Sequence, residues 1–509
     1  MRKRVFIFLL AVLCGLLIAP LANVLSHPNV GMEKWLERKN LYNLDFASKW
    51  PNFLLYQFGI STHPEQVVIG REGWLYLGDN YAQSRTVTRD GQTPADLVNS
   101  QKIGAASQAW EIWLKNRGVR LFRVMVGPDK ESIYPEYLPT WARPAATTAT
   151  DALIAGTGTD RYIDLRASLL AAKATHPEAL YYKTDTHWNQ LGAGTAFLAF
   201  ARHAGRSAPE LRWPTDAVRV TGMASRNGGD LSGFLRIQGR LTDSEPSTAI
   251  LGRPVEVTQY DFDTRQMLQK GGNPKLASPK KPLLIISEGA LNTRKVLWLR
   301  DSFGEAMAPF MAATFSETVQ LHWGEALKPD GRFVELVEKW KPDYVFITVV
   351  ERESRSDLFS LSPPLQITGP SKNFKLVRAS SRVGMNDIVE GKAANEYHLK
   401  GADPFVEYAL DPAQNMSDAS FLNLNVTCDD GTAKVPMQLF WLKDGEGHYK
   451  EEQSVRFEIL SGTHLIDLRS APGWPMNETV NRIRLDIDSK GACVDLRLVN
   501  PALGLVTGG

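Results

Sequence analysis

Apolar residues follow three different patterns along the chain, and each pattern predicts a different kind of structure. Residues 5–25 form an apolar run that only Pro20 and Asn23 interrupt. From about residue 65 to residue 375, short apolar runs alternate with stretches of helical spacing, as in α/β folds. After about residue 390, apolar and polar residues alternate with a period of two, which is typical of strands. The order of these patterns predicts an N-terminal apolar segment, an α/β domain and an all-β domain.

The N-terminal apolar run follows Arg2, Lys3 and Arg4 and is long enough to cross a bilayer, which takes roughly 20 apolar residues. Basic residues on a short leading segment keep that side cytoplasmic, so we expect the rest of the chain in the periplasm. We predict an uncleaved signal anchor in the inner membrane over residues 1–28. The alternative is a cleavable signal peptide with the small residues 19–22 near its cleavage site, which would release the protein into the periplasm.

The α/β domain is predicted to span residues 29–385. Residues 101–117 have helical spacing, Gly118 ends that helix, and residues 119–126 follow as an apolar strand. Further strands are expected at 162–165, 283–286, 296–299 and 344–350. The turn-rich segment 205–280 is expected to contain an insertion or a lid. These features predict a sheet with helices between its strands.

The all-β domain is predicted to span residues 390–509 and to form a sandwich, because several short alternating runs are separated by turn signals. The alternating runs lie at 421–426, 437–442, 482–487 and 494–498. The aromatic residues of this domain either stack on sugars or fill its core, and they include Phe440, Trp441, Tyr449 and Trp474. A sandwich attached to an extracytoplasmic enzyme is often a carbohydrate-binding domain, which is an analogy at the level of the fold.

Composition narrows the classes of function. A chain of 509 residues exceeds the size of a single hydrophobic core, and its net charge of +2 gives no general preference for nucleic acid. No Cys-x-x-Cys, His-Glu-x-x-His or phosphate-loop pattern occurs, so no metal or nucleotide cofactor is predicted.

Cys428 and Cys493 are predicted to pair in an oxidising compartment. Two buried free thiols are the alternative, because sequence supplies no geometry.

Two short motifs inside the α/β domain carry the candidate chemistry. Residues 185–189 read Asp-Thr-His-Trp-Asn, which places a carboxylate two residues before a histidine. A carboxylate on one ring nitrogen fixes the tautomer of a histidine and stabilises its protonated form. Residues 300–303 read Arg-Asp-Ser-Phe, and they join an apolar strand to a helix-like stretch. The first motif alone is more often structural, so the two motifs count mainly in combination.

Ser302 is a candidate nucleophile because it lies at the predicted turn from a strand to a helix. Open α/β sheets bind their ligands at the carboxyl ends of their strands. The backbone N–H of Ser302 would join the positive end of the helix, which can stabilise an oxyanion. The alternative is that Ser302 only caps the helix. Together with His187 and Asp185, Ser302 favours a triad of nucleophile, base and orienting carboxylate.

Four motifs occur in an order that resembles the AlgX/AlgJ group of SGNH-hydrolase-like proteins. These are the periplasmic O-acetyltransferases of alginate and related exopolysaccharides, and the motifs lie at 73–78, 128–139, 185–189 and 300–303. The resemblance implies a flavodoxin-like α/β fold with a circularly permuted motif order, since His187 precedes Ser302. It implies Ser302 as nucleophile, His187 as base and Asp185 as orienting carboxylate. It also implies a polysaccharide substrate, a membrane-bound O-acyltransferase as relay of the acetyl donor and a C-terminal carbohydrate-binding sandwich.

The predicted function is transfer of acetyl groups, through an acetyl-serine, to hydroxyls of an exopolysaccharide or cell-wall polysaccharide. Residues near the motifs are candidates for substrate binding, namely Arg300, Trp188, Lys130 and Tyr134. A salt bridge for Arg300 and a core position for Trp188 are the alternatives. Two other functions remain open, an acetyl esterase with the same triad and a non-catalytic scaffold that holds glycan.

Overall fold

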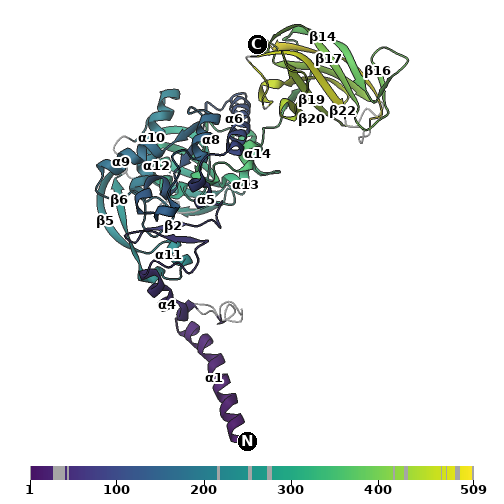
Figure 1. The fold of residues 1–509 in the computed structure, drawn as a ribbon. Coiled ribbons are helices and arrows are strands. Elements are labelled where there is room, and N and C mark those ends of the chain that lie inside the picture. The colour runs from purple at the N-terminus through teal and green to yellow at the C-terminus, as the bar shows by residue number, and fades with distance from the viewer. Residues whose placement is uncertain are drawn as a thin grey trace.

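The structure is a computed structural model that describes most of the chain. The described residues are 2–26, 41–42, 45–214, 218–249, 255–271, 278–416, 419–428, 434–471, 473–476, 478–487 and 493–506. Their strands form an eight-stranded sheet, an eleven-stranded sheet and two short hairpins (Figure 1). Helices and strands alternate in the first part of the chain, and strands dominate the last part. The predicted fold class, mixed α/β followed by a mostly-strand region, is therefore confirmed.

The N-terminal helix α1 (Arg2–Ser26) is long and apolar enough to cross a membrane, judged by its length and composition. A signal sequence near an N-terminus passes the same test, so both alternatives for this segment stay open. A second helix, α4 (Asp45–Gln57), precedes the first hairpin. The predicted start of the α/β domain at residue 29 lies outside the described residues.

The eight-stranded sheet has the order β4-β3-β12-β10-β11-β9-β7-β8. Its strands are β3 (Leu121–Gly127), β4 (Tyr162–Asp164), β7 (Glu256–Asp261), β8 (Met267–Lys270), β9 (Leu283–Glu288), β10 (Asn292–Arg300), β11 (Phe315–Leu321) and β12 (Tyr344–Val350). The five strands from β4 to β11 run parallel, and the last three are antiparallel. Parallel strands end at one edge of the sheet, so the turns after β3, β10 and β12 are neighbours there.

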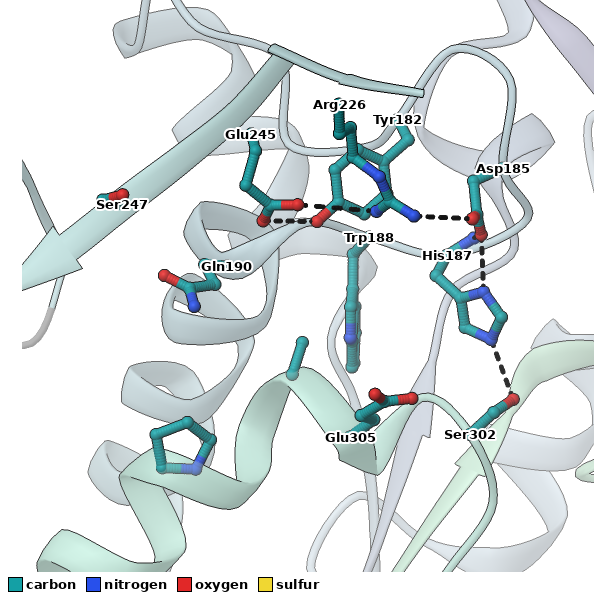
Figure 2. Close-up of a pocket in the computed structure, with 12 residues that line it drawn as sticks. Tyr182, Asp185, His187, Trp188, Gln190, Arg226, Glu245, Ser247, Ser302 and Glu305 are labelled. Carbon is teal, nitrogen blue, oxygen red and sulfur yellow. Dashed lines mark hydrogen bonds and ion pairs between the residues drawn. The ribbon is translucent and has the colours of Figure 1, made fainter. Parts of the chain in front are cut away.

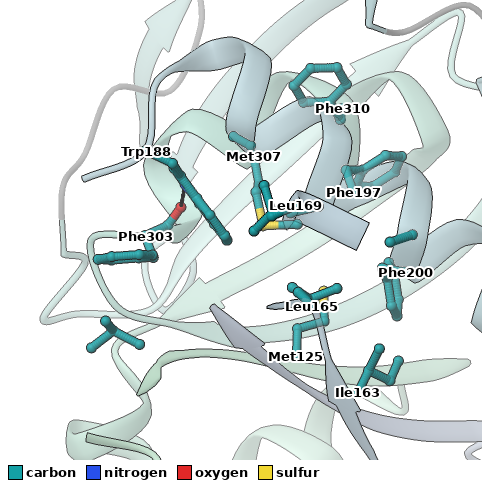
Figure 3. Close-up of a cluster of buried hydrophobic side chains, with 14 of the residues drawn as sticks. Met125, Ile163, Leu165, Leu169, Trp188, Phe197, Phe200, Phe303, Met307 and Phe310 are labelled. Atoms are coloured by element: carbon teal, nitrogen blue, oxygen red, sulfur yellow. Dashed lines mark hydrogen bonds between the residues drawn. The ribbon is translucent and has the colours of Figure 1, made fainter. Parts of the chain in front are cut away.

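Helices cover both faces of this sheet. The helices of this part of the chain are α5 (Ser84–Asp90), α6 (Pro94–Lys115), α7 (Lys130–Ile133), α8 (Ala149–Thr157), α9 (Arg166–Thr175), α10 (Gln190–Ser207), α11 (Asp230–Phe234), α12 (Gly304–Thr314), α13 (Trp323–Leu327) and α14 (Phe333–Trp340). Alternate residues of a strand face opposite sides. Met125 of β3 therefore packs with Phe197 and Phe310 of α10 and α12 (Figure 3), whereas Val124 packs in a second cluster with residues of α6 and α14.

Several local features match the sequence, and two differ from it. The predicted hairpin is present as β1 (Val67–Ile69) and β2 (Leu75–Leu77). Helix α6 begins earlier than predicted, because Thr93 and Asp96 form a reciprocal capping box. The segment 205–280, which is expected from sequence to contain an insertion or a lid, also contributes strands to the main sheet. It contains the separate pair of β5 (Arg219–Asn227) and β6 (Thr242–Ala249), and also β7 and β8 of the main sheet.

The eleven-stranded sheet holds the C-terminal part of the chain. Its strands are β13 (Gln366–Thr368), β14 (Phe374–Asn386), β15 (Ile388–Glu390), β16 (Glu396–Leu399), β17 (Phe405–Asn415), β18 (Phe421–Cys428), β19 (Val435–Lys443), β20 (Ser454–Ile459), β21 (Gly462–Asp467), β22 (Thr479–Ile487) and β23 (Asp495–Val506). The predicted boundary near residue 390 is too late for this sheet, because β13 and β14 already belong to it. Strand β14 is largely exposed and lacks the alternation that marks half-buried strands.

Side chains of this second sheet enclose one apolar core. Trp441 and Trp474 lie inside it with ring centroids 5.2 Å apart, so these two aromatic residues are core residues and do not form a sugar platform. Phe440 and Tyr449 instead flank the guanidinium of Arg484. A disulfide joins Cys428 at the end of β18 to Cys493 just before β23, with Cα atoms 5.6 Å apart.

Candidate active site

Ser302 lies in the turn between β10 and α12, at the carboxyl edge of the parallel strands. The preceding residue, Asp301, is buried and organises this turn. One Asp301 oxygen accepts the Phe303 backbone N–H at 2.9 Å, and the other accepts the Val350 N–H at the end of β12 at 2.7 Å. The turn is thus tied to the neighbouring strand, and the Ser302 side chain is half-exposed at its tip.

His187 and Asp185 meet Ser302 in one chain of hydrogen bonds (Figure 2). The Nε2 atom of His187 lies 2.8 Å from Ser302 Oγ, and its Nδ1 atom lies 2.7 Å from Asp185 Oδ1. The same Asp185 oxygen also accepts the His187 backbone N–H at 3.1 Å. The three predicted triad residues are therefore in contact, in the arrangement that nucleophile, base and orienting carboxylate require.

A buried lysine, Lys130, binds the backbone of the segment that carries His187. The Lys130 ammonium group donates hydrogen bonds to three backbone carbonyls, those of Tyr182, Lys183 and Asp185, at 3.0, 3.0 and 2.7 Å. These contacts use all three donors of the ammonium group. Burial lowers the pKa of Lys130 to about 8, although nearby carboxylates oppose that shift. Lys130 therefore fixes the backbone around Asp185.

Two further carboxylates brace the same segment from the side. Asp230 accepts the backbone N–H and the hydroxyl of Thr186 at 2.8 and 2.6 Å. Asp243 accepts the backbone N–H of Lys183 at 2.8 Å and the hydroxyl of Thr184 at 2.5 Å. These hydrogen bonds hold the residues on either side of Asp185 and limit its movement.

Gly229 makes the closest backbone approach to the triad. A Cβ atom at this position would lie 2.3 Å from both Cβ and Oδ2 of Asp185, which is too close for any real contact. The backbone N–H of Gly229 donates to Thr184 Oγ1 at 2.8 Å, so the segment cannot simply move away. Only glycine fits this position without displacing the carboxylate that orients His187.

The electrostatics of the pair suit a general base. Burial alone would raise the pKa of Asp185, but the hydrogen bond and charge of His187 outweigh it and lower that pKa to about 2. Burial alone would lower the pKa of His187, but the hydrogen bond and charge of Asp185 raise it above the ordinary 6.5. Asp185 is therefore ionised at neutral pH, and His187 is a stronger base than a free imidazole.

A cavity of about 440 Å³ opens beside Ser302 and His187 (Figure 2). The residues that line it are Tyr182, Asp185, His187, Trp188, Gln190, Arg226, Glu245, Ser247, Ser302, Glu305, Ala306 and Pro309. The hairpin of β5 and β6 supplies one wall, and the first turns of α10 and α12 supply the other. The cavity gives the Ser302 hydroxyl room for a reacting group.

The hairpin wall contains a linked set of polar side chains. The Tyr182 hydroxyl donates to Glu245 Oε1 at 2.5 Å. Arg226 lies over the Tyr182 ring, with its NH1 3.5 Å from Glu245 and its NH2 3.6 Å from Asp185. Sequence reasoning missed Arg226 and Glu245, because both come from the segment that it interpreted as an insertion or lid.

Three of the four predicted substrate-binding residues lie outside the lining of this cavity. Lys130 holds backbone carbonyls, as described above. Tyr134 stacks on Trp74, and its hydroxyl accepts the Leu180 backbone N–H at 2.9 Å. Arg300 is fully buried and donates to Gln320 Oε1 at 2.8 Å. Each of these side chains is enclosed by protein and lies outside the lining of the cavity.

Trp188 has a mixed position. It borders the cavity, but only 1% of its surface is exposed, and its Nε1 donates to the Phe303 carbonyl at 3.0 Å. Its main role in the structure is to pack the segment of His187 against the turn of Ser302. The alternative of a core indole is therefore the better description.

Asp185, His187 and Asp230 offer ligand atoms that all lie within 4.8 Å of one another, which is a spacing that suits a metal ion. Protein groups already use these atoms. His187 Nδ1 bonds to Asp185 at 2.7 Å, and both Asp230 oxygens accept hydrogen bonds from Thr186. The arrangement is thus explained by the hydrogen bonds that orient His187.

Part of the chain is similar to a known protein family. Residues 67–277 match a family model described as the SGNH hydrolase-like domain of the acetyltransferase AlgX. The matched residues lie within the α/β region. The matched segment contains Asp185 and His187 and ends before Ser302. The predicted resemblance to the AlgX/AlgJ group is confirmed.

Individual relatives share less than 30% sequence identity with this chain. A probable alginate O-acetylase AlgJ of Pseudomonas syringae pv. tomato is 27% identical over 216 residues, which are 42% of this chain and 50% of the relative. The chain thus spans about half the length of the curated relative that it matches. Bacillus cereus PatB1 shares 16% identity over 58% of this chain and 98% of its own, with a TM-score of 0.43. Pseudomonas aeruginosa AlgX shares 14% sequence identity over 87% of this chain and 96% of its own, with a TM-score of 0.33. At such TM-scores no residue role is transferred from either structure.

Proposed function

We propose that this protein is an O-acetyltransferase that carries acetyl groups on Ser302 and passes them to hydroxyls of a polysaccharide. The observation that supports this most is the hydrogen-bond chain from Asp185 through His187 to Ser302, which ends in an open cavity, and two of these residues lie in the segment that matches the AlgX-type domain. A fully enclosed serine would have no space for an acyl group, whereas the Ser302 hydroxyl borders a cavity of about 440 Å³.

The first half-reaction loads the enzyme. His187 Nε2 takes the proton of Ser302 Oγ while that oxygen attacks the carbonyl carbon of an acetyl donor. The backbone N–H of Ser302, in the turn just before α12, stabilises the oxyanion. The donor's leaving group departs with the proton from His187, and acetyl-Ser302 remains. Asp185 keeps the imidazole oriented and stabilises its charged form during the transfer.

The second half-reaction releases the acetyl group to the acceptor. His187 Nε2 takes the proton of a sugar hydroxyl, whose oxygen attacks the acetyl carbon of acetyl-Ser302. The bond between that carbon and Ser302 Oγ breaks, and His187 returns its proton to Ser302 Oγ. A second acceptor, water, would give hydrolysis by the same steps, which is the esterase alternative.

The cellular setting is part of the proposal. We propose that the remainder of the chain lies in the periplasm, since helix α1 has the length and composition of an anchor in the inner membrane or of a signal that is removed. A membrane-bound O-acyltransferase then relays the acetyl donor, because Ser302 lies on the far side of the membrane from cytoplasmic acetyl donors. The C-terminal sheet is proposed to hold the polysaccharide near the cavity.

The test uses the full chain with an activated acetyl ester and a set of neutral and acidic oligosaccharides. We expect acetylated sugar, with an acetyl group on Ser302 as intermediate. Free acetate without acetylated sugar from any acceptor would favour the esterase. Neither product, in a protein that binds oligosaccharide, would favour the non-catalytic scaffold.

A further inference from the structure

Charge in the cavity beside Ser302 indicates which sugars can reach the site. Its lining contains three carboxylates, those of Asp185, Glu245 and Glu305, against the guanidinium of Arg226 and the imidazole of His187. Asp230 lies just behind, 3.7 Å from His187 Nδ1. The cavity is therefore an acidic environment around the reacting hydroxyl.

Arg226 does not offset this charge for a ligand, because protein groups already engage it. Its NH1 and NH2 atoms lie 3.5 and 3.6 Å from Glu245 and Asp185, and its plane covers the Tyr182 ring. A ligand carboxylate that took Arg226 would leave both of these carboxylates without it. The nearby cation Arg352 is likewise taken, by an ion pair with Asp129.

Glu305 is the carboxylate with the most freedom to meet a ligand. It lies in the first turn of α12, its backbone N–H donates to the Ser302 carbonyl at 3.0 Å, and its side chain borders the cavity (Figure 2). Within the part of the chain that the structure describes, its side chain has no hydrogen-bond or ion-pair partner. A carboxylate is an acceptor only, so its natural ligands here are hydroxyl donors.

We infer that the acceptor sugar at this site is uncharged and that Glu305 receives hydrogen bonds from its hydroxyl groups. This inference rests on the proposed acetyl transfer. Gln190 and Ser247 add neutral polar groups to the same walls, and Ala306 and Pro309 add an apolar patch for the ring. A uronate would instead bring a carboxylate beside Glu305. Even when they lie about 10 Å apart, two unpaired like charges lower affinity roughly tenfold at the effective dielectric of a protein surface.

The experiment compares matched acceptors on the full chain. Oligomannuronate and oligoglucuronate are each paired with the same oligosaccharide after reduction of its carboxylates to alcohols, so only the charge differs. Acetyl-Ser302 is first formed from an activated acetyl ester and followed by intact mass. If it does not form, the proposed function fails. If it forms, its rate of loss with each acceptor, and the mass of the acetylated sugar, test the inference.

We expect the reduced member of at least one pair to accept acetyl about tenfold or more faster than its uronate, with a gap that narrows as salt rises. Glu305→Gln should narrow the gap as well. Glu338→Gln, which removes the same charge from an exposed position on α14, should leave it unchanged. The inference is overturned if the uronate equals or exceeds its reduced partner in both pairs, or if the gap is insensitive to Glu305→Gln. It is equally overturned if no uncharged oligosaccharide shortens the lifetime of acetyl-Ser302.

Discussion

The two large sheets bury very different side chains. At the edge of the eight-stranded sheet, charged residues are buried in number, among them Asp129, Lys130, Asp185, Asp243, Asp301 and Glu351. In the described part of the eleven-stranded sheet, the buried charged residues are Arg378 and Asp467, and the core is otherwise apolar. Burying a charge is costly unless it is paired and hydrogen-bonded.

The buried charges of the first region cost stability, and they surround the residues of the candidate active site. Several buried charges in the first region belong to the triad or hold a segment beside it, as Lys130 and Asp301 do. The second sheet gains its stability from apolar packing and from the disulfide between Cys428 and Cys493. Substitutions in the first region should therefore alter turnover, whereas substitutions in the second should alter stability.

The largest effect should come from the triad itself. We expect His187→Ala and Ser302→Ala each to lower ester turnover on the order of 10³-fold or more, and the double variant to be no worse than either. The reason is that an oriented base has no use without its nucleophile. Steady-state turnover of an activated acetyl ester measures this. His203→Ala on α10 is the control and should retain turnover; an additive loss in the double variant would separate the two residues mechanistically.

The next effect should come from the close approach behind Asp185. Gly229→Ala would place a Cβ atom 2.3 Å from the carboxylate, so Asp185 must shift and His187 loses its orientation. A displacement of this kind can lower the rate by about 10²-fold. Gly239→Ala is the matched control, since a Cβ atom there meets nothing within 4 Å. Equal turnover of the two variants would show that the position of Asp185 next to Gly229 is not needed for activity.

The pH profile should show the influence of Asp185 on the base. His187 acts only when deprotonated, and its pKa is raised, so activity should fall with decreasing pH at a midpoint above 6.5. Asp185→Asn removes the charge that raises this pKa, so the midpoint should move down. The dependence of kcat/KM on pH gives both midpoints. A midpoint that is lower in the wild type than in Asp185→Asn would contradict the prediction that Asp185 raises the pKa of His187.

The smallest effect on chemistry should come from the disulfide. Cys428→Ser should destabilise the second sheet by about 2–4 kcal/mol, because the bridge closes a loop with a sequence separation of 65. Hydrogen exchange in peptides of β18 and β23 measures the loss of protection, with turnover of the acetyl ester assayed in parallel. Slower turnover at full occupancy of the native state would mean that the two regions are not as independent as their cores suggest.

Much of this arrangement could be predicted from sequence where a local rule applies. The strand and helix around Ser302 follow from apolar runs and a turn, and Asp185 stands two residues before His187 in the chain. The start of α6 could also have been found, since Thr93 and Asp96 form a recognisable capping signal. The pairing of His187 with Ser302, 115 residues apart, came from chemistry and resemblance rather than from spacing.

The walls of the cavity could not be predicted in the same way. Arg226 and Glu245 reach the triad only because β5 and β6 fold back beside α10, which no local pattern encodes. A strand pattern also does not say whether a polar residue faces a cavity or the interior. Arg300 was therefore predicted as a substrate contact, and the structure instead buries it against Gln320. Buried polar residues that support a site look like ligand-binding residues in sequence.

The central claim is that Ser302 carries the acetyl group. The direct measurement is intact and peptide mass analysis of the full chain after brief reaction with a slow acetyl donor. We predict an acetyl group on the peptide that contains Ser302 in the wild type, its loss when acceptor sugar is added, and none on that peptide in Ser302→Ala. A folded Ser302→Ala variant that still acetylates sugar at a rate near that of the wild type would contradict the account.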